Sequence, residues 1–180
     1  ELAPKYSLRP MANPRNEIVF VCTANTCRSP MAEGLFRHAL LAQDEPMKSL
    51  IVSSAGVSTY DKQPPANNAV TAMSKVGIDI KNHKSQPITE ELIDRALAFF
   101  AMTDTHLAML SFRVDPPPSN AFLMRQFIEA DANDEIPDPF GMSLNHYEAC
   151  RDSMVEAIPS LLQVVKTLYE AQLGGQSVDQ

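Results

Sequence analysis

Cysteine is scarce in this chain of 180 residues, which has three in all and no tryptophan. An odd number of cysteines does not make a complete disulfide framework, so we expect a reducing compartment and a cytoplasmic protein. No Cys-x-x-Cys pair occurs, and the four histidines are scattered along the sequence. The residues that usually bind zinc in paired spacing are therefore lacking, and we expect neither a metal nor another cofactor.

Positive charge and long apolar runs are also limited. The chain has 15 Lys and Arg against 22 Asp and Glu, a net charge of −7. Nucleic-acid-binding domains usually carry a basic face, so nucleic acid is not an expected partner. The apolar runs fall well short of the roughly 20 residues that cross a bilayer, so no membrane association is expected either.

The first 15 residues contain three prolines and no apolar core, which is unlike a signal peptide. We interpret residues 1–15 as an N-terminal tail or a cloning remnant. Residues 16–175 have the length of one ordinary domain.

Short apolar runs alternate with helical patterns along this domain. Strands are predicted at 17–22, 50–54, 96–102 and from 121, and helices at 30–42, 66–76, from 89, at 103–112 and from 143. Pro159 should bend the last helix, and the glycines at 174 and 175 should end it. The alternation predicts an α/β, doubly wound fold, with a four-stranded parallel sheet and helices on both faces. Ligands of such folds bind at the carboxyl ends of the strands, where Cys22 would lie.

The segment after the first strand reads Cys-Thr-Ala-Asn-Thr-Cys-Arg-Ser-Pro, from Cys22 to Pro30. Ser29 and Pro30 suit the N-cap and first position of a helix. Amides of a tight loop that runs into a helix N-terminus bind anions, and Arg28 could grip two phosphate oxygens. The same surroundings favour the thiolate of Cys22, a nucleophile for phosphoryl transfer. The plainer alternative is a buried cysteine ending a strand and a surface arginine.

Residues 21–33 resemble the signature of the low-molecular-weight protein tyrosine phosphatases, of bacterial type. Three more segments fit this family in order: Ser-Ser-Ala-Gly at 53–56, Ala-Met-Thr at 101–103 and Ile-Pro-Asp-Pro-Phe at 136–140. The resemblance spans about residues 16–170. It implies that a phosphorylated protein or peptide is hydrolysed through a phosphocysteine without a metal, and that phosphate-like oxyanions inhibit.

The resemblance also assigns roles to single residues. Asp138, held between two prolines, matches the family's general acid, whereas an Asp-Pro pair alone could simply begin a turn. The phosphate-binding loop would comprise Thr23, Ala24, Asn25, Thr26, Cys27, Arg28 and Ser29. Asn25 tolerates a left-handed backbone, and the family pairs it with a histidine that His83 would match. Ser54 would support the loop, and Ser29 could also donate to Cys22.

Ala24 departs from the family pattern, and Cys27 leaves two interpretations open. Most relatives carry glycine where this chain has Ala24, which would be strained by about 1–2 kcal/mol if its φ were positive. Cys27 matches a cysteine that can form a protective disulfide with the nucleophile in this family. Alternatively, Cys27 is a small buried side chain under the loop.

Thr26 bears on the substrate. Tyrosine-specific relatives usually have isoleucine there, whereas the arginine phosphatases of this family have threonine, so the sequence leans towards phosphoarginine over phosphotyrosine. Phe140 could form a wall of the pocket for either substrate. Two alternatives remain. One is an arsenate reductase, which would need two further redox cysteines, and the other is a non-catalytic phosphoresidue-binding module.

Overall fold

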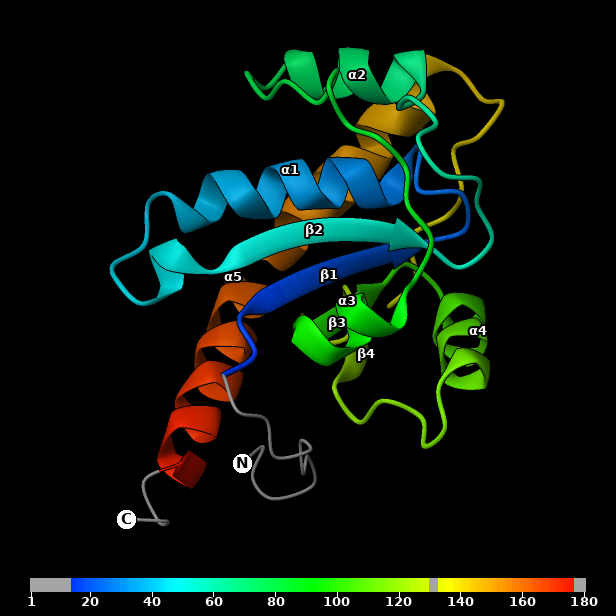
Figure 1. Cartoon of the computed structure of the whole chain (residues 1–180). Coiled ribbons are helices and arrows are strands. Elements are labelled where there is room, and N and C mark those ends of the chain that lie inside the picture. Colours follow the sequence, from blue (N-terminus) through cyan, green and yellow to red (C-terminus); the bar gives the residue numbers. More distant parts are fainter. Residues whose placement is uncertain (1–13, 130–132, 177–180) are drawn as a thin grey trace.

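The computed structural model describes residues 14–129 and 133–176, and most of the predicted N-terminal tail lies outside these ranges. The ordered elements are β1 (Glu17–Cys22), α1 (Arg28–Leu40), the short helix η1 (Met47–Ser49), β2 (Ile51–Gly56), α2 (Asn67–Ser74), α3 (Glu90–Arg95), β3 (Ala96–Ala101), α4 (Asp104–Arg113), β4 (Ala121–Leu123) and α5 (Leu144–Gln176). Strands and helices alternate along the chain as the apolar patterns predicted (Figure 1).

The four strands form one parallel sheet in the order β2-β1-β3-β4. The pairing register places Cys22, the last residue of β1, beside Gly56, the last residue of β2. Met102, just beyond β3, donates its amide to the Val21 carbonyl. The carboxyl ends of the central strands therefore meet at one edge of the sheet, where the segments that follow them gather (Figure 1). The predicted doubly wound α/β fold is confirmed.

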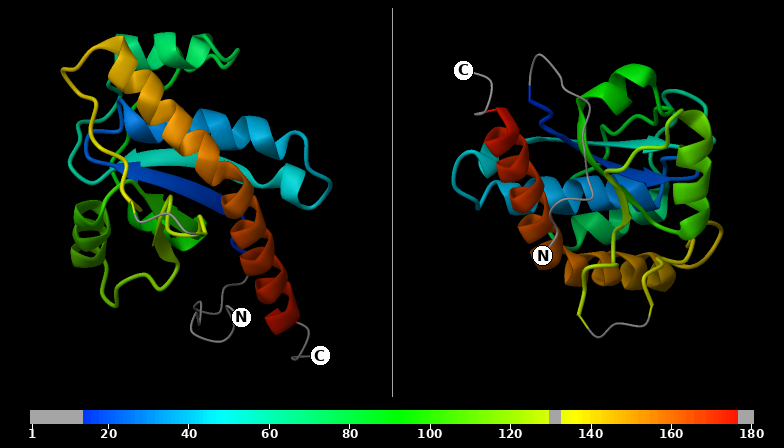
Figure 2. Two further views of the ribbon diagram at one scale, coloured as in Figure 1. Left: turned by 180° about the vertical axis from the view of Figure 1, so that it is seen from behind. Right: turned by 90° about the horizontal axis from the view of Figure 1, so that it is seen from below.

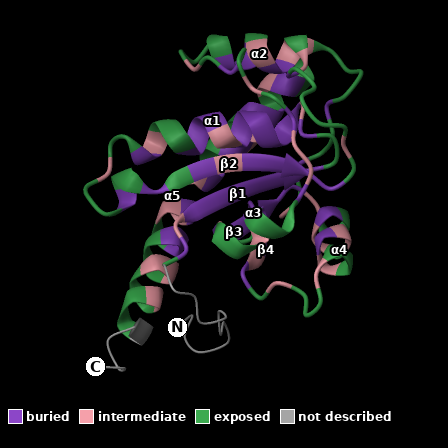
Figure 3. Cartoon of the chain, in the orientation of Figure 1, coloured by how far each residue is buried: buried purple, intermediate pink, exposed green. Residues whose placement is uncertain are grey.

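Helices cover both faces of the sheet. One face packs against α1 and α5, with α2 packed on these two helices, in a core that includes Phe20, Phe36 and Phe100. The other face packs against α3 and α4, in a smaller core around Phe99 and Leu110. In the left view of Figure 2, from behind, α5 crosses in front of the sheet from the loop edge towards the opposite end. All six residues of β1 and all six of β3 are buried, which explains their unbroken apolar runs (Figure 3).

Several boundaries differ from the prediction. Helix α1 begins at Arg28, with Cys27 as its N-cap and no side-chain cap, so the predicted cap at Ser29 is wrong. Helix α5 continues through the two glycines to Gln176 and contains Pro159, and Figure 2 shows it change direction partway along. The threonines at 89 and 103 do cap α3 and α4 with their side chains. Within the described ranges, no helix has the length and apolar character that crossing a bilayer requires.

Candidate functional site

The loop from Cys22 to Arg28 lies at the carboxyl edge of the sheet between β1 and α1. Its first and last side chains are almost inaccessible, with Cys22 3% exposed and Arg28 4% exposed. Asn25 is fully buried, whereas Thr23 and Ala24 are exposed. The loop therefore folds back around Asn25 and presents its first turn to solvent.

Five successive backbone carbonyls of this loop point away from its centre, because each accepts a hydrogen bond from a segment outside the loop. The pairs are Val57 amide to Cys22 (3.0 Å), Ser58 amide to Thr23 (3.0 Å), Thr59 Oγ1 to Ala24 (2.5 Å), His83 Nε2 to Asn25 (2.8 Å) and Ala66 amide to Thr26 (2.8 Å). An outer belt thus holds the loop, and it consists of Val57, Ser58, Thr59, Ala66 and His83.

The backbone amides of the same loop have no such partners in the described ranges. Among the described residues, none supplies a hydrogen-bond acceptor to the amides from Thr23 to Ser29. Successive unpaired amides beside a helix N-terminus create a positive concavity that suits a phosphate-sized oxyanion. Cys22 begins this run of amides, so an oxyanion held by them would lie close to its thiol.

Asn25 holds the loop in shape through its backbone and its side chain. Its φ of 59° is left-handed, whereas Ala24 has no positive φ and so carries no such strain. The Asn25 side-chain Nδ2 donates to Ser29 Oγ at 2.8 Å and to Ser54 Oγ at 2.9 Å. Its Oδ1 accepts from the backbone amide of Gln86 at 2.9 Å. One side chain therefore links the loop to α1, β2 and the segment before α3.

A carboxylate on α1 supports this network. Glu33 accepts a short hydrogen bond from the Ser54 hydroxyl, and its Oε2 lies 3.7 Å from His83 Nδ1. His83 in turn meets the loop through the Asn25 carbonyl, so its partner is the backbone of Asn25. The structure thus brings Ser54 and His83 to the loop, and it adds Glu33, which sequence reasoning had not singled out.

Ser29 lies beside Cys22, the predicted nucleophile. The Ser29 Oγ lies 3.0 Å from Cys22 Sγ and accepts a hydrogen bond from the side-chain Nδ2 of Asn25. Because Asn25 occupies one lone pair of that hydroxyl, the Ser29 proton is free to donate to a Cys22 thiolate. This use of the hydroxyl also explains why Ser29 does not cap α1.

Arg28 and Asp138 form an ion pair at the end of the loop. Arg28 Nη2 is 3.4 Å from Asp138 Oδ2, and Arg28 Nη1 donates to the Ile136 carbonyl at 2.9 Å. The Asp138 side chain is 53% exposed, and its Oδ1 accepts from the Phe140 amide at 3.1 Å. A guanidinium has five N–H groups, so Arg28 retains donors for an oxyanion.

All three cysteines are free thiols. Cys27 Sγ is 3.4 Å from the Tyr147 hydroxyl under the loop, and burial raises the pKa of the Cys27 thiol. Burial also raises the pKa of Cys150, in α5, to about 12. The structure therefore has Cys27 in its buried arrangement and not in the disulfide arrangement.

The two residues predicted to shape the pocket differ in exposure. Thr26 is half-buried, with its Oγ1 3.9 Å from Cys27 Sγ, and Phe140 is 74% exposed beside Asp138. Tyr60, 84% exposed, follows the belt residue Thr59 and was not predicted. The sequence indicates Tyr60 only as a bulky aromatic side chain in a polar loop.

His106 is a third residue near the loop that the sequence did not reveal. It lies in the first turn of α4 and is 3% exposed, with Nε2 2.9 Å from Thr23 Oγ1 and Nδ1 3.2 Å from Thr103 Oγ1. Burial, aided by the charge of Arg28, lowers the pKa of His106 to about 4. The ring is therefore neutral at physiological pH. Eighty-three positions separate His106 from Thr23, so no spacing in the sequence could have indicated that the two side chains meet.

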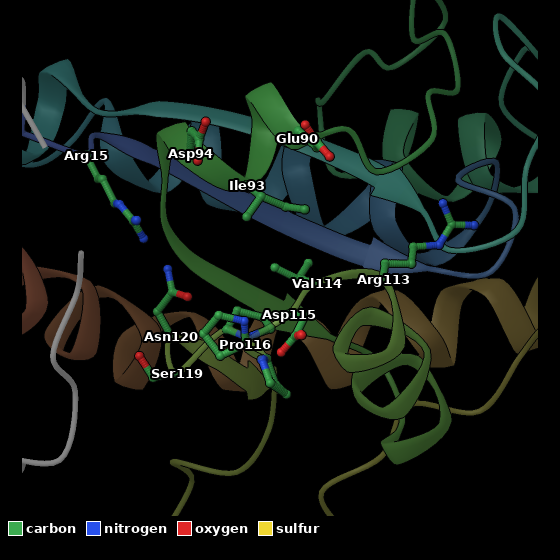
Figure 4. A pocket seen from close by; sticks show the side chains of 12 residues that line it. Arg15, Glu90, Ile93, Asp94, Arg113, Val114, Asp115, Pro116, Ser119 and Asn120 are labelled. Carbon is green, nitrogen blue, oxygen red and sulfur yellow. The ribbon is translucent and has the colours of Figure 1, made fainter. Parts of the chain in front are cut away.

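A separate hollow of about 360 Å³ lies beneath α3, away from the loop. Figure 4 shows it lined by Arg15, Asp94, Arg113 and the proline-rich segment that leads into β4. Neither Cys22 nor Asp138 belongs to its lining. In the part of the chain that is described, no three His, Cys, Asp or Glu side chains gather as a metal site would require.

Comparison with known proteins gives this geometry a context. Residues 17–172 match the family described as low molecular weight phosphotyrosine protein phosphatase. The protein-arginine-phosphatase of Bacillus subtilis is 35% identical over 150 residues, which cover 83% of this chain and 97% of that protein. An arsenate reductase of Staphylococcus aureus is 43% identical over only 79 residues, 44% of this chain and 53% of its own length.

A solved structure extends the likeness to three dimensions. It is a YwlE arginine phosphatase mutant with a phosphorylated active-site serine, 32% identical, with a TM-score of 0.72 over 83% of this chain and 95% of its own. The family match runs from the first strand to the last helix and includes the whole loop, so the prediction of a protein phosphatase is confirmed at the level of the family. This chain belongs to the low molecular weight phosphotyrosine protein phosphatase family.

Proposed function

We propose that this protein hydrolyses phosphorylated proteins through a phosphocysteine on Cys22, and that phosphoarginine is its preferred substrate. The observation that carries the proposal is the position of Cys22 Sγ, 3.0 Å from Ser29 Oγ and at the start of a loop whose amides have no acceptor among the described residues. This arrangement supports a thiolate at Cys22 that accepts from Ser29, and a loop that binds an oxyanion beside it. We also infer a cytoplasmic location from the three free thiols.

In the first step, the Cys22 thiolate attacks phosphorus and the bond from phosphorus to the leaving nitrogen or oxygen breaks. Asp138 gives its proton to the leaving atom, which departs as a guanidinium or a phenol. Arg28 and the loop amides hold the non-bridging phosphoryl oxygens, where charge is distributed in the transition state.

In the second step, water attacks the phosphocysteine. Asp138, now a carboxylate, takes a proton from that water, and the sulfur–phosphorus bond breaks to release phosphate and the thiolate. Ser29 donates to the sulfur as its charge returns. The residues of the chain thus supply the nucleophile, the acid and base, and the oxyanion contacts.

The preference for phosphoarginine rests on Thr26 and Asp138. The Thr26 hydroxyl can accept a hydrogen bond from a guanidinium N–H, and Asp138, half-exposed at the mouth, can pair with its charge. Phe140 can stack on either a guanidinium or an aromatic ring. The arginine phosphatase of Bacillus subtilis, similar over nearly its whole length, supports the same choice.

The alternatives have weaker support. An arsenate reductase of this architecture would need further redox cysteines near the nucleophile, and residues 70–110 contain none. A phosphoresidue-binding module would not need both Cys22 and an Asp138 that is paired with the loop's Arg28.

The test compares initial rates on matched phosphoarginine and phosphotyrosine peptides, for the wild type, Thr26→Ile and Cys22→Ser. We expect faster turnover of phosphoarginine, a preference that Thr26→Ile reverses, and no turnover by Cys22→Ser. A preference for phosphotyrosine in both active proteins would contradict the role of Thr26. Absence of any turnover by the wild type would contradict the phosphatase proposal.

A further inference from the structure

We propose that the Thr23 side chain, fixed by His106, is a second specificity determinant, whose hydroxyl accepts a hydrogen bond from the guanidinium of phosphoarginine. This inference rests on the proposed function, which it deepens. Thr23 would contact the substrate, whereas His106 would act through Thr23 as a positioning residue.

Thr23 directly follows the nucleophile in a rigid part of the loop. Its carbonyl accepts from the Ser58 amide at 3.0 Å, and a Cβ on Gly56 would lie 2.6 Å from that oxygen. The backbone of Thr23 is thus packed closely on the inner side, while the residue as a whole is exposed. Its side chain therefore belongs to the accessible mouth of the site.

His106 determines where the Thr23 hydroxyl lies. The ring is held between Thr23 Oγ1 at 2.9 Å and Thr103 Oγ1 at 3.2 Å. Thr103 also accepts the His106 amide as the cap of α4, so the helix start fixes the ring. A ring that is 3% exposed and hydrogen-bonded at both nitrogens leaves Thr23 Oγ1 little freedom to move.

This hydroxyl lies on the side of the loop where the leaving group departs. The His106 ring is close enough to Asp138 and Glu135 for their charges to act on it, together with that of Arg28. The Asp104 amide donates to Glu135 Oε1 at 2.7 Å, which joins the start of α4 to the segment that carries Asp138. Thr23 and the proposed general acid thus face the same part of a bound substrate.

Thr23 Oγ1 can accept a hydrogen bond in either tautomer of the neutral ring. If His106 Nε2 carries the proton, it occupies one Thr23 lone pair and leaves the other available. If Nδ1 carries it, the Thr23 hydroxyl donates to Nε2 and both lone pairs remain. The conclusion is therefore independent of the tautomer.

The leaving group decides whether that lone pair is used. A guanidinium presents N–H donors around the atom bonded to phosphorus, whereas a phenyl ring presents only C–H groups. Losing a hydrogen bond to a charged group should change the ratio of kcat/KM for phosphoarginine to that for phosphotyrosine by roughly ten- to hundredfold. A site that accepts such a hydrogen bond also disfavours a substrate that has no donor. Thr23 would thus add discrimination to that of Thr26.

The test measures kcat/KM on phosphoarginine and phosphotyrosine peptides of the same flanking sequence. Thr23→Val keeps the shape and removes the acceptor, and should lower the phosphoarginine-to-phosphotyrosine ratio roughly ten- to hundredfold. His106→Phe should lower the ratio in the same direction, whereas His106→Gln, whose amide can still reach Thr23, should keep it within about threefold of the wild type. Thr105→Val, an exposed threonine of α4, is the matched control and should leave the ratio unchanged.

Each failure has a different signature. An unchanged ratio in Thr23→Val, or an equal loss on both peptides in His106→Phe and His106→Gln, would overturn this inference. A wild type that prefers phosphotyrosine would contradict the proposed function, although the effect of Thr23→Val on the ratio could still be measured. A wild type without any phosphoarginine turnover would overturn both proposals.

Discussion

Replacing Asn25 tests whether the anion-binding loop is held by a single buried side chain. Asn25→Ala removes three hydrogen bonds, to Ser29, Ser54 and the Gln86 amide, each of 2.8–2.9 Å. At about 1 kcal/mol each, their loss amounts to about 3 kcal/mol. Alanine at a φ of 59° adds at least about 1 kcal/mol of strain. We therefore expect Asn25→Ala to lower the free energy of unfolding by about 4 kcal/mol.

A second substitution separates the two contributions. Asn25→Gly loses the same hydrogen bonds but tolerates the left-handed backbone, so it should be more stable than Asn25→Ala. Glycine's greater freedom in the unfolded chain offsets part of that difference, which should be at most about 1 kcal/mol. Asn68→Ala is the control, because Asn68 is partly exposed and its amide makes one long hydrogen bond, of 3.3 Å, to the Met142 carbonyl.

The assay is urea denaturation followed by far-ultraviolet circular dichroism, since the chain has no tryptophan for fluorescence. A loss below about 1 kcal/mol in Asn25→Ala would show that the outer belt alone holds the loop. A glycine variant less stable than the alanine variant would refute the argument from backbone strain. Phosphatase activity should fall in both variants, because their loop amides are no longer held in place before the substrate binds.

Three further substitutions follow from the site. Asp138→Asn should lower kcat on phosphotyrosine peptides by roughly 10²–10⁴-fold while inorganic phosphate still inhibits, and a loss below tenfold in steady-state rates would exclude Asp138 as the acid. His106 has a folded pKa of about 4, below its usual value of 6.5, so the unfolded chain binds its proton first and stability falls as the pH drops through this window. Urea titrations across this pH window should show that the free energy of unfolding falls by up to about 3 kcal/mol more in the wild type than in His106→Gln. An equal pH dependence in the two proteins would contradict the burial of a neutral ring. Gly56→Ala would bring a Cβ to 2.6 Å from the Thr23 carbonyl, so we expect about 1–3 kcal/mol of destabilisation and reduced activity, whereas wild-type values for both would show that the loop yields easily.

The sequence predicted those features that depend on neighbouring residues. The unbroken apolar runs of β1 and β3 identified buried parallel strands, and the threonines before α3 and α4 marked true caps. The loop between β1 and α1 could also be predicted, because its spacing and the helix after it lie within ten residues. Asn25 was expected to adopt the left-handed backbone that it has.

Contacts between distant segments could not be predicted in this way. Ser29 has the right residue type for a cap, but tertiary hydrogen bonds to Cys22 and Asn25 take its hydroxyl and α1 begins earlier. The belt holds the loop carbonyls mostly with backbone amides. Because any residue except proline supplies such an amide, the residue types of the belt do not reveal it. His106 reaches Thr23 only because β3 lies beside β1 in the sheet.

The outward-facing carbonyls of the loop have a consequence for how such enzymes diverge. Since the belt grips the main chain, the oxyanion contacts are independent of most side chains between Cys22 and Arg28. If Thr26 selects the substrate as proposed, a substitution there would change which phosphorylated residue is admitted while the loop backbone keeps its shape. The side chains of Cys22, Arg28 and Asp138 would still provide the proposed chemistry, so one scaffold could acquire a new target by changing the remaining loop side chains.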